Sequence, residues 1–338
     1  MTCTSLDFYH IEEVAGAGRG AIASSNIAQD TVVLRSGPPT AHVIFRQYRK
    51  EVCAQCFYYD RGRTLAVRDS STGKVFCGSG CQAFWQDVQG RVGVTAWESL
   101  HTFVQAASKH ITDGYDVTEA ERRLDMLTTE GLWKQTEATR SVNGQARKPA
   151  TKQSVDPDIL GFLLSSIISH YLGSKKWQEE VSSLAMDDSP YRSRSEFDAH
   201  LTSFLQLTDL LQHPSTNALI PHCNAEVCSK AVAAAGHNSF GIRSEDGEEY
   251  MGFALYPTAS YFNHSCRPNV SKQRVGSQWV FSAAQDISEG EECCITYLGG
   301  DEKDMSHIER QDRLKQHWGF VCMCKLCFEE TSHRRTGQ

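Results

Sequence analysis

The chain has 338 residues, of which 40% are hydrophobic and 22% are charged, a balance that suits a globular protein with a sizeable core and one or two small additional modules. Its formal net charge of −7 argues against a general DNA- or RNA-binding protein, whose binding surface is usually basic. No apolar run approaches the roughly 18 residues of a membrane span, and the N-terminus lacks the pattern of a signal peptide. We therefore expect a protein of the nucleus, the cytoplasm or both, with no membrane association and no direct nucleic acid partner.

The first fifty residues are expected to form short strands joined by turns. Residues 16–20, Gly-Ala-Gly-Arg-Gly, predict a flexible turn. Residues 31–34 are a strand candidate, which the Gly-Pro-Pro run at 37–39 ends.

Residues 53–81 are bounded by cysteines at both ends. Thirteen cysteines are many for a reducing compartment, where disulfides rarely persist and tight Cys clusters more often bind metals. Zinc favours four tetrahedral ligands, and thiolates two or three residues apart can reach one ion from a single turn. We predict one structural zinc whose binding supplies the folding free energy of this module; a set of unligated thiols is the alternative. Its ligands would be Cys53, Cys56, Cys77 and Cys81.

The segment from about 82 to 240 has helical character, because its apolar residues recur at helical intervals. The clearest stretches are Ala120–Leu127, Ile159–Leu172 and Phe197–Leu211. The polar stretch 140–156 reads as a loop between two of them.

After about residue 240 short strand-like runs return, bounded by Gly, Pro or acidic turns. They are Gly252–Tyr256, Val270–Arg274, Gln278–Ala284 and Cys293–Tyr297. An acidic Asp-Gly turn at 244–249 is either a solvated hairpin tip or a patch that steers a basic substrate. Residues 305–317 are compatible with a helix.

The stretch Tyr261–Asn269, Tyr-Phe-Asn-His-Ser-Cys-Arg-Pro-Asn, is the most informative segment. It places polar side chains and a cysteine between two strand-like runs. Buried polar groups must find partners, so the segment predicts a ligand site, with a plain polar turn as the alternative.

Together with three other segments this stretch resembles the SET methyltransferase family. Residues 290–297, Gly-Glu-Glu-Cys-Cys-Ile-Thr-Tyr, are similar to the Gly-Glu-Glu strand of that family. Residues 318–327 resemble its post-SET cysteine cluster, and residues 18–23 resemble its cofactor-binding turn. A metal module and a helical insert inside a split SET domain resemble the SET-and-MYND subfamily. Residues 76–82 look like the latter part of a MYND zinc finger, although the ligands of a second zinc in that module are missing.

The resemblance implies an α+β protein: a split SET β-fold with an inserted small zinc module, a helical insert and a zinc-bound post-SET segment. The expected parts are 1–50, the N-terminal part of the SET domain; 51–90, the MYND-like zinc module; 91–215, the helical insert; 216–299, the SET catalytic core; and 300–330, the post-SET zinc segment. Larger members of the subfamily carry a C-terminal helical domain over the substrate cleft. Because this chain stops at Gln338, we expect a more open cleft.

The resemblance also implies an S-adenosylmethionine-dependent protein-lysine N-methyltransferase. Tyr297 would orient the lysine amine for in-line methyl transfer; a strand aromatic is the alternative interpretation. Tyr256 and Tyr261 are candidates for the wall of the substrate channel, with plain packing as an equal alternative. The cofactor-binding residues implied by the resemblance are Ala17, Gly18, Arg19, Asn238, Asn263, His264, Tyr297 and Phe320.

A second zinc is implied at the C-terminal cysteines. Cys322, Cys324 and Cys327 supply three thiolates, and the family supplies the fourth from the position of Cys266. His307 and His317 are the alternative fourth ligands. The expected cofactors are thus S-adenosylmethionine and two structural zinc ions, and the expected partner is a protein substrate with a target lysine, in a histone tail or elsewhere. The competing hypothesis is a catalytically weak, zinc-stapled SET scaffold that acts as a protein-interaction module.

Overall fold

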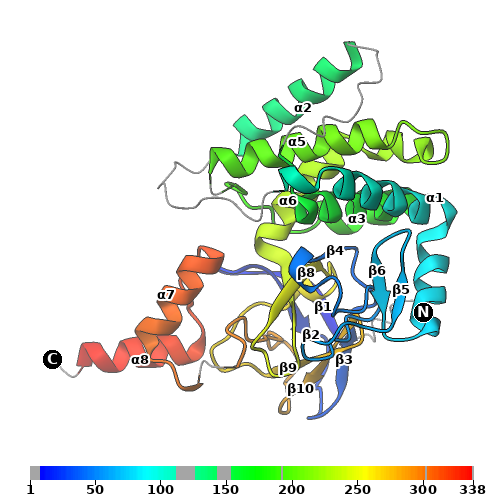
Figure 1. The fold of residues 1–338 in the computed structure, drawn as a ribbon. Helices are drawn as coiled ribbons and strands as arrows, with labels where there is room; N and C mark the ends of the chain where they lie inside the picture. Colours follow the sequence, from blue (N-terminus) through cyan, green and yellow to red (C-terminus); the bar gives the residue numbers. More distant parts are fainter. Residues whose placement is uncertain (1–7, 112–125, 143–153, 192, 301–302, 337–338) are drawn as a thin grey trace. The chain divides into compact units, whose positions relative to one another are not determined.

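The computed structural model describes residues 8–111, 126–142, 154–191, 193–300 and 303–336 (Figure 1). The chain forms two compact units. We call residues 1–39 and 256–338 the split unit, because it joins both ends of the chain, and residues 40–255 the helical unit. None of the described helices has the length and hydropathy needed to cross a bilayer.

The split unit is built on antiparallel strands from both ends of the sequence. β1 (Tyr9–Val14) and β2 (Gly18–Ala23) form a hairpin. β10 (Gln278–Ala283) pairs on one side with β3 (Val32–Arg35) and on the other with β9 (Val270–Val275). This pairing brings an early strand beside two late ones and confirms the strands expected near 31–34, 270–274 and 278–284.

A buried aromatic group forms the core beneath these strands. Phe262 packs edge-on against Phe281 of β10, with ring centroids 4.8 Å apart, and against Tyr9 of β1 at 5.1 Å. It follows the short 3-10 helix η4 (Ala259–Tyr261). Because Phe262 is fully buried, it anchors the polar residues that come directly after it in the chain.

The strand expected at Cys293–Tyr297 does not form, so this expectation is wrong. The segment instead makes isolated bridges, from Glu292 to Ile22 and from Ile295 to His264. Successive backbone groups of the segment bond to different neighbours, so no continuous ladder with one strand can develop: Cys293 N–H donates to Ala21 O, and Ile295 N–H donates to Asn263 O.

Two helices end the split unit. α7 (His307–Trp318) begins with a capping box between Ser306 and Glu309 and ends at Gly319 in the left-handed conformation. This confirms the helix expected near 305–317. α8 (Lys325–Thr336) begins within the terminal cysteines and was not expected from the sequence.

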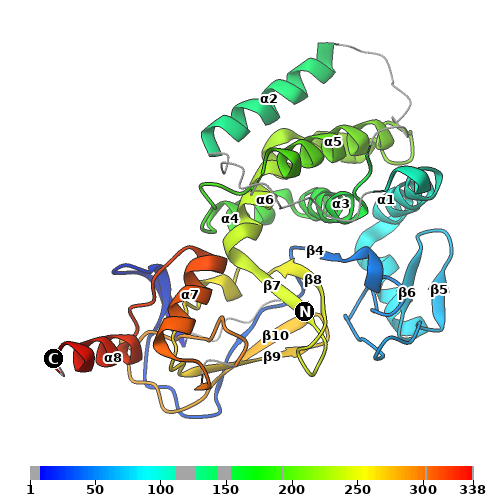
Figure 2. The same ribbon diagram turned by 60° about the vertical axis from the view of Figure 1, so that its left-hand side comes forward.

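The helical unit has two small sheets and six α-helices among its described residues (Figure 2). One sheet has the order β4-β8-β7, and β5 pairs with β6. The strands are β4 (Ala41–Ile44), β5 (Val67–Asp69), β6 (Lys74–Phe76), β7 (Ser239–Arg243) and β8 (Tyr250–Leu255). The helices are α1 (Ser79–Ala106), α2 (Met126–Val142), α3 (Pro157–Leu172), α4 (Ser174–Ser182), α5 (Arg194–Leu210) and α6 (Ala225–Asn238), with 3-10 turns η1 (Arg46–Tyr48), η2 (Ser108–His110) and η3 (Asn217–His222).

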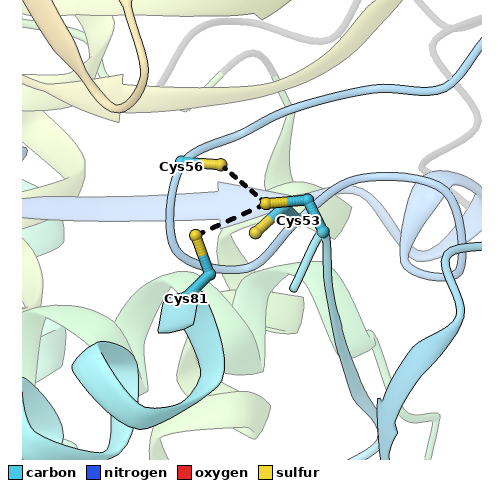
Figure 3. A group of neighbouring side chains, drawn as sticks. Cys53, Cys56 and Cys81 are labelled. Atoms are coloured by element: carbon cyan, nitrogen blue, oxygen red, sulfur yellow. Dashed lines mark hydrogen bonds between the residues drawn. The ribbon is translucent and has the colours of Figure 1, made fainter. Parts of the chain in front are cut away.

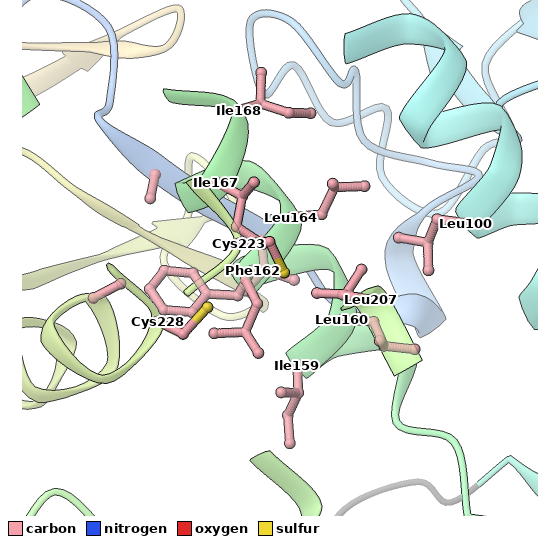
Figure 4. Close-up of a cluster of buried hydrophobic side chains, with 14 of the residues drawn as sticks. Leu100, Ile159, Leu160, Phe162, Leu164, Ile167, Ile168, Leu207, Cys223 and Cys228 are labelled. Atoms are coloured by element: carbon pink, nitrogen blue, oxygen red, sulfur yellow. The ribbon is translucent and has the colours of Figure 1, made fainter. Parts of the chain in front are cut away.

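Helix α3 forms the centre of the helical unit. It starts at an Asp156 N-cap followed by Pro157, and its apolar side chains from Pro157 to Ile168 are buried on all sides of the helix, as expected for a helix enclosed by others. Leu100 of α1 and Leu207 of α5 reach the same core (Figure 4). The helices expected at 159–172 and 197–211 are thus confirmed, whereas 120–125 and most of the loop expected at 140–156 lie outside the described residues.

Candidate active site and metal centres

The turn between β1 and β2 offers exposed backbone. Ala17 N–H donates to Val14 O at 3.0 Å, which closes the turn. Gly18 has a φ of 73°, a left-handed conformation that favours glycine, and a Cβ added there would meet nothing within 4 Å. Ala17, Gly18 and Arg19 are all exposed, so a ligand can approach this backbone closely.

Asn263 connects this turn to the Gly-Glu-Glu segment. Its Nδ2 donates to Arg19 O at 3.3 Å and to Glu292 Oε1 at 2.9 Å. Because a backbone carbonyl and a carboxylate both accept hydrogen bonds, these contacts determine which side of the amide carries nitrogen. The amide therefore directs its carbonyl oxygen Oδ1 away from this pair, where it can accept a hydrogen bond from a ligand.

Gly20 makes the contact between Asn263 and Glu292 possible. A Cβ at Gly20 would lie 2.6 Å from Glu292 Oε1 and 3.0 Å from Asn263 Nδ2, which is too close for a real side chain. Neither Gly20 nor Glu292 was among the site residues expected from the sequence. The available signal was the Gly-Glu-Glu motif, which we interpreted only as part of a strand.

His264 joins the site to the C-terminal cysteines. Its Nδ1 accepts a hydrogen bond from Tyr297 N–H at 3.0 Å, and its Nε2 lies 3.3 Å from Cys266 Sγ. Since Nδ1 acts as an acceptor, the neutral imidazole carries its proton on Nε2 and donates it toward the sulfur. One largely buried ring thus connects the backbone of Tyr297 to a cysteine.

Tyr297 and Phe320 complete the aromatic lining. The Tyr297 ring lies 5.4 Å from His264 and 6.3 Å from Phe320, and Phe320 lies 6.3 Å from His264. The Tyr297 hydroxyl donates to Phe262 O at 3.2 Å, so its oxygen can still accept. Burial, followed by the charges of Cys294 and Glu292, raises the pKa of this phenol above its ordinary value.

The other tyrosines and Asn238 have different surroundings. Tyr261 lies under the Arg19 guanidinium, 5.5 Å from its ring centroid. Tyr256 is buried, and its hydroxyl donates to Ser277 O at 2.8 Å. Asn238 ends α6 in the helical unit, where its Nδ2 donates to Ala234 O and Ala185 O. The channel role of the tyrosines and the cofactor role of Asn238 stay predictions.

The C-terminal cysteines and Cys266 meet in the split unit. We call Cys266, Cys322, Cys324 and Cys327 the second cluster; their four Sγ atoms lie within 4.8 Å of one another. A tetrahedral zinc site with bonds of about 2.3 Å needs sulfur separations of about 3.8 Å. Cys266 Sγ lies 3.9 Å from Cys322 Sγ and 3.6 Å from Cys327 Sγ, so the donor set fits zinc.

The two histidines considered as fourth ligands lie in other surroundings. His307 Nδ1 pairs with Glu330 at 3.1 Å. The His317 ring packs against Trp318, with centroids 5.7 Å apart. The structure therefore brings Cys266, and neither histidine, into the second cluster.

The N-terminal cysteines meet in the helical unit. We call Cys53, Cys56, Cys77 and Cys81 the first cluster; their sulfurs also lie within 4.8 Å of one another (Figure 3). The distances from Cys77 Sγ are 3.6 Å to Cys56 and 3.4 Å to Cys81. The Phe76 ring packs at a tilt against Trp85 beside them, with centroids 5.7 Å apart, which gives the small module an apolar core. This donor set likewise fits one zinc ion.

Comparison with known proteins agrees with this arrangement. The model of the SET domain family matches residues 18–298. The potential protein lysine methyltransferase SET6 of Saccharomyces cerevisiae is 24% identical over 368 residues, which cover 96% of this chain and 95% of that protein. A SET and MYND domain-containing protein of Dictyostelium discoideum is 38% identical over 90 residues, covering 27% of this chain and 22% of that protein. The histone-lysine N-methyltransferase SMYD3 of Homo sapiens is 39% identical over 98 residues, covering 29% and 22%.

The two shorter alignments span 22% of each relative, about a fifth of its length, whereas the yeast alignment is nearly complete on both sides. The family model and these relatives confirm the resemblance to SET proteins with SET-and-MYND relatives. Together with the two cysteine clusters that could bind zinc, they also confirm the expected fold class. The family model covers well over half of the chain. The chain therefore belongs to the SET domain family of protein-lysine methyltransferases.

Proposed function

We propose that the protein transfers a methyl group from S-adenosylmethionine to a lysine of a protein substrate, with Tyr297 orienting the amine. The observation that carries this proposal is the meeting of three distant segments in the split unit. Asn263 bonds the Arg19 backbone, and His264 accepts the Tyr297 N–H. The Phe320 ring centroid lies 6.3 Å from the His264 ring and 6.3 Å from the Tyr297 ring.

Several features of the site suit S-adenosylmethionine, which when bound supplies an electrophilic methyl group on a sulfonium. The exposed backbone of Ala17, Gly18 and Arg19 can bind the amino-acid end, because the space beside the Gly18 Cα is open. Asn263 Oδ1 presents an acceptor that suits an ammonium donor. The rings of His264 and Phe320 can pack against the flat adenine. Asn238 stays a further candidate contact.

The acceptor lysine must react as a neutral amine. Its ordinary pKa is near 10.4, so the site has to favour the deprotonated form at neutral pH. Removal from water and a nearby positive charge both lower the pKa of an amine. Tyr297 suits this task because burial raises the pKa of its phenol, which keeps it neutral and adds no negative charge that would hold the ammonium form.

The Tyr297 oxygen then has one clear function. Its hydroxyl hydrogen is donated to Phe262 O, which leaves oxygen lone pairs to accept from the substrate amine. The amine is thereby oriented for in-line displacement. The proton of the substrate ammonium leaves to water, and no side chain is assigned as a general base.

The two cysteine clusters would hold structural zinc. In the first cluster the ion would stabilise the small module formed by β5, β6 and the start of α1. In the second it would tie the segment that carries Phe320 to Cys266, two residues after His264. Zinc at the second cluster would therefore support the cofactor site.

The substrate is proposed to be a protein with an accessible lysine, in a histone tail or in another protein. Histones are the first substrates to test, since SMYD3 is named as a histone-lysine N-methyltransferase. The nucleus and the cytoplasm, where such substrates occur, stay the proposed locations.

The deciding experiment combines calorimetry of S-adenosylmethionine binding with transfer of tritiated methyl groups to histones and to a cell extract. Wild type should bind and transfer. Tyr297→Phe should bind with similar affinity yet lose most of its transfer, while Tyr58→Phe, an exposed tyrosine of the other unit, should behave as wild type. Binding by wild type without transfer to any protein would favour the catalytically weak scaffold.

A further inference from the structure

Two histidines of the helical unit face each other through their ring nitrogens. His170 lies in the last turn of α3, and His222 ends the 3-10 turn η3. Their two Nδ1 atoms are 2.8 Å apart. His170 is buried, whereas His222 is partly exposed, so solvent can reach the pair from the side of His222. Because histidine is the commonest metal ligand of proteins, two ring nitrogens brought together from separate elements are a candidate metal site.

A hydrogen bond joins the two rings in the structure. Gln178 Nε2 lies 3.4 Å from His170 Nε2, so the amide N–H donates to this ring nitrogen. His170 then carries its proton on Nδ1 and donates it to Nδ1 of His222. Both rings are neutral in this arrangement, and the second proton of the pair is on Nε2 of His222.

Aromatic neighbours hold both rings in place. Trp177 of α4 packs edge-on against His170, with centroids 5.1 Å apart and ring planes at 88°. Tyr171 packs in the same way against His222, at 5.4 Å and 82°. Packing therefore fixes the orientation of the two imidazoles, which is what a metal site requires of its ligands.

The separation of the two nitrogens suits a metal ion whose ligands are at right angles. Bonds from a metal to imidazole are about 2.0–2.1 Å long, so a right angle puts two nitrogens about 2.9 Å apart and a tetrahedral angle about 3.4 Å apart. The observed 2.8 Å agrees with the right angle. Such coordination by nitrogen and oxygen is typical of Ni²⁺ and Cu²⁺, so the pair fits these ions better than it fits zinc.

We propose that His170 and His222 form a labile binding site for a divalent transition metal of the nickel and copper type. Their Nδ1 atoms would bind the ion, and water would fill its other positions. Among the described residues, groups of three or more candidate ligands occur only at the two cysteine clusters, so this two-ligand site should bind more weakly than they do. The inference goes beyond the proposed methyl transfer and does not rest on it.

Gln178 would support His170 in the metal-bound form. To offer Nδ1 to an ion, His170 must move its proton from Nδ1 to Nε2, which changes neither its charge nor its number of protons. If the Gln178 amide turns over, its oxygen accepts the new Nε2–H, and its nitrogen faces the Ser182 hydroxyl, which lies 3.4 Å from the amide oxygen in the structure. A partner on the outer nitrogen is the usual support of a metal-bound histidine.

The test is calorimetric titration of Ni²⁺ into the full-length protein as purified, at pH 7.5, above the usual pKa of histidine. A colorimetric zinc indicator in a parallel sample reports any zinc that nickel displaces. Wild type should bind one nickel ion per chain at this site without losing zinc. His170→Gln and His222→Gln should each weaken this binding at least about tenfold, since glutamine keeps a hydrogen bond but offers no imidazole. His213→Gln removes an exposed histidine of the same unit and should bind nickel as wild type does.

Two results would overturn the inference: wild type that binds no nickel, or equal nickel binding by wild type and both histidine variants. If His170→Gln fails to fold, His222→Gln decides, because its position is partly exposed and circular dichroism can confirm its fold. Gln178→Met leaves both Nδ1 atoms in place and should weaken nickel binding about tenfold, within the range found for groups that support metal ligands. An unchanged affinity in Gln178→Met would overturn the part assigned to Gln178.

Discussion

Each of the two cysteine clusters offers four Sγ atoms at similar separations, but the clusters are assembled differently from the sequence. The first is drawn from residues 53–81, so a short piece of chain encloses it. The second combines Cys266 with three cysteines more than fifty residues later. Its sulfurs also contact groups that belong to the site, since His264 reaches both Cys266 and Tyr297. A metal in the first cluster should therefore matter locally, and one in the second should matter for catalysis.

Replacing one ligand in each cluster gives the largest expected difference. Cys266→Ser should lose the second zinc and, with it, the support of His264 and Phe320, so methyl transfer should fall on the order of 100-fold and cofactor affinity should fall with it. Zinc content, calorimetry and methyl transfer measure the three effects. Cys81→Ser is the matched variant, and it should lose one zinc while cofactor affinity stays near wild type. Zinc loss in Cys266→Ser with normal cofactor binding would disprove the coupling.

A pair of glycine variants sharpens the same contrast. Gly20→Ala places a Cβ 2.6 Å from Glu292 Oε1 and should disturb the Asn263 amide, because overpacking of this kind costs roughly 1–3 kcal/mol. We expect S-adenosylmethionine to bind about tenfold more weakly, as measured by calorimetry.

Gly80 lies beside Cys81 in α1, and a Cβ there meets nothing within 4 Å. Gly80→Ala should therefore leave cofactor binding unchanged and stabilise the helix by up to about 1 kcal/mol. Equal effects of the two alanines on cofactor affinity would show that Gly20 has no special function.

Much of the site could be predicted because its residues form short local motifs. The spacing of cysteines identified the first cluster and three members of the second, whereas Cys266 was implied only by the resemblance to the SET family. The stretch around Asn263 and His264 stands out without knowledge of the fold. Gly20 and Glu292 could not be found this way, since each matters through contacts with residues far along the chain. The strand expected at Cys293–Tyr297 failed for the same reason: its backbone partners come from several segments.

The fold shows a similar limit. Apolar periodicity predicted α3 and α5, because α3 is strongly apolar and α5 repeats large apolar side chains, Phe197, Phe204 and Leu207, on its buried face. α8 has a mostly polar sequence whose apolar residues do not recur at helical intervals, so this helix could not be predicted from the sequence. It starts among the cysteines of the second cluster, and Glu330 ties it to His307 and Arg310 of α7.

Treatment with a mild chelator should separate the clusters by rate. Cys77 is exposed and two other cysteines of the first cluster are partly exposed, whereas Cys266, Cys322 and Cys327 are buried. The first zinc should therefore leave several-fold faster than the second. Methyl transfer should persist until the second ion leaves, which zinc release and activity followed in one sample would reveal. Activity that falls in step with the first zinc would contradict the local role of the first cluster.

The smallest expected effect concerns acid stability, and it belongs to the unit that carries the first cluster. Burial, together with the charge of Lys74, lowers the pKa of His42 to about 3. An unfolded chain binds this proton below about pH 6.5, whereas the folded unit resists it until about pH 3. Between these values the unfolded state holds more protons, so acidification favours unfolding. Burial also lowers the pKa of His170 and His222, so these histidines add to the loss of folding stability on acidification.

His42→Gln removes one part of this dependence. Thermal unfolding followed by circular dichroism between pH 7 and 5, with zinc content checked at each pH, should show a smaller fall in Tm than in wild type, by a few degrees. His213→Gln, at an exposed position of the same unit, is the matched control and should keep the wild-type slope. If both variants fall as steeply as wild type, proton uptake by the zinc thiolates rather than by His42 controls acid unfolding. The first cluster would then determine the stability of its unit as well as its local fold.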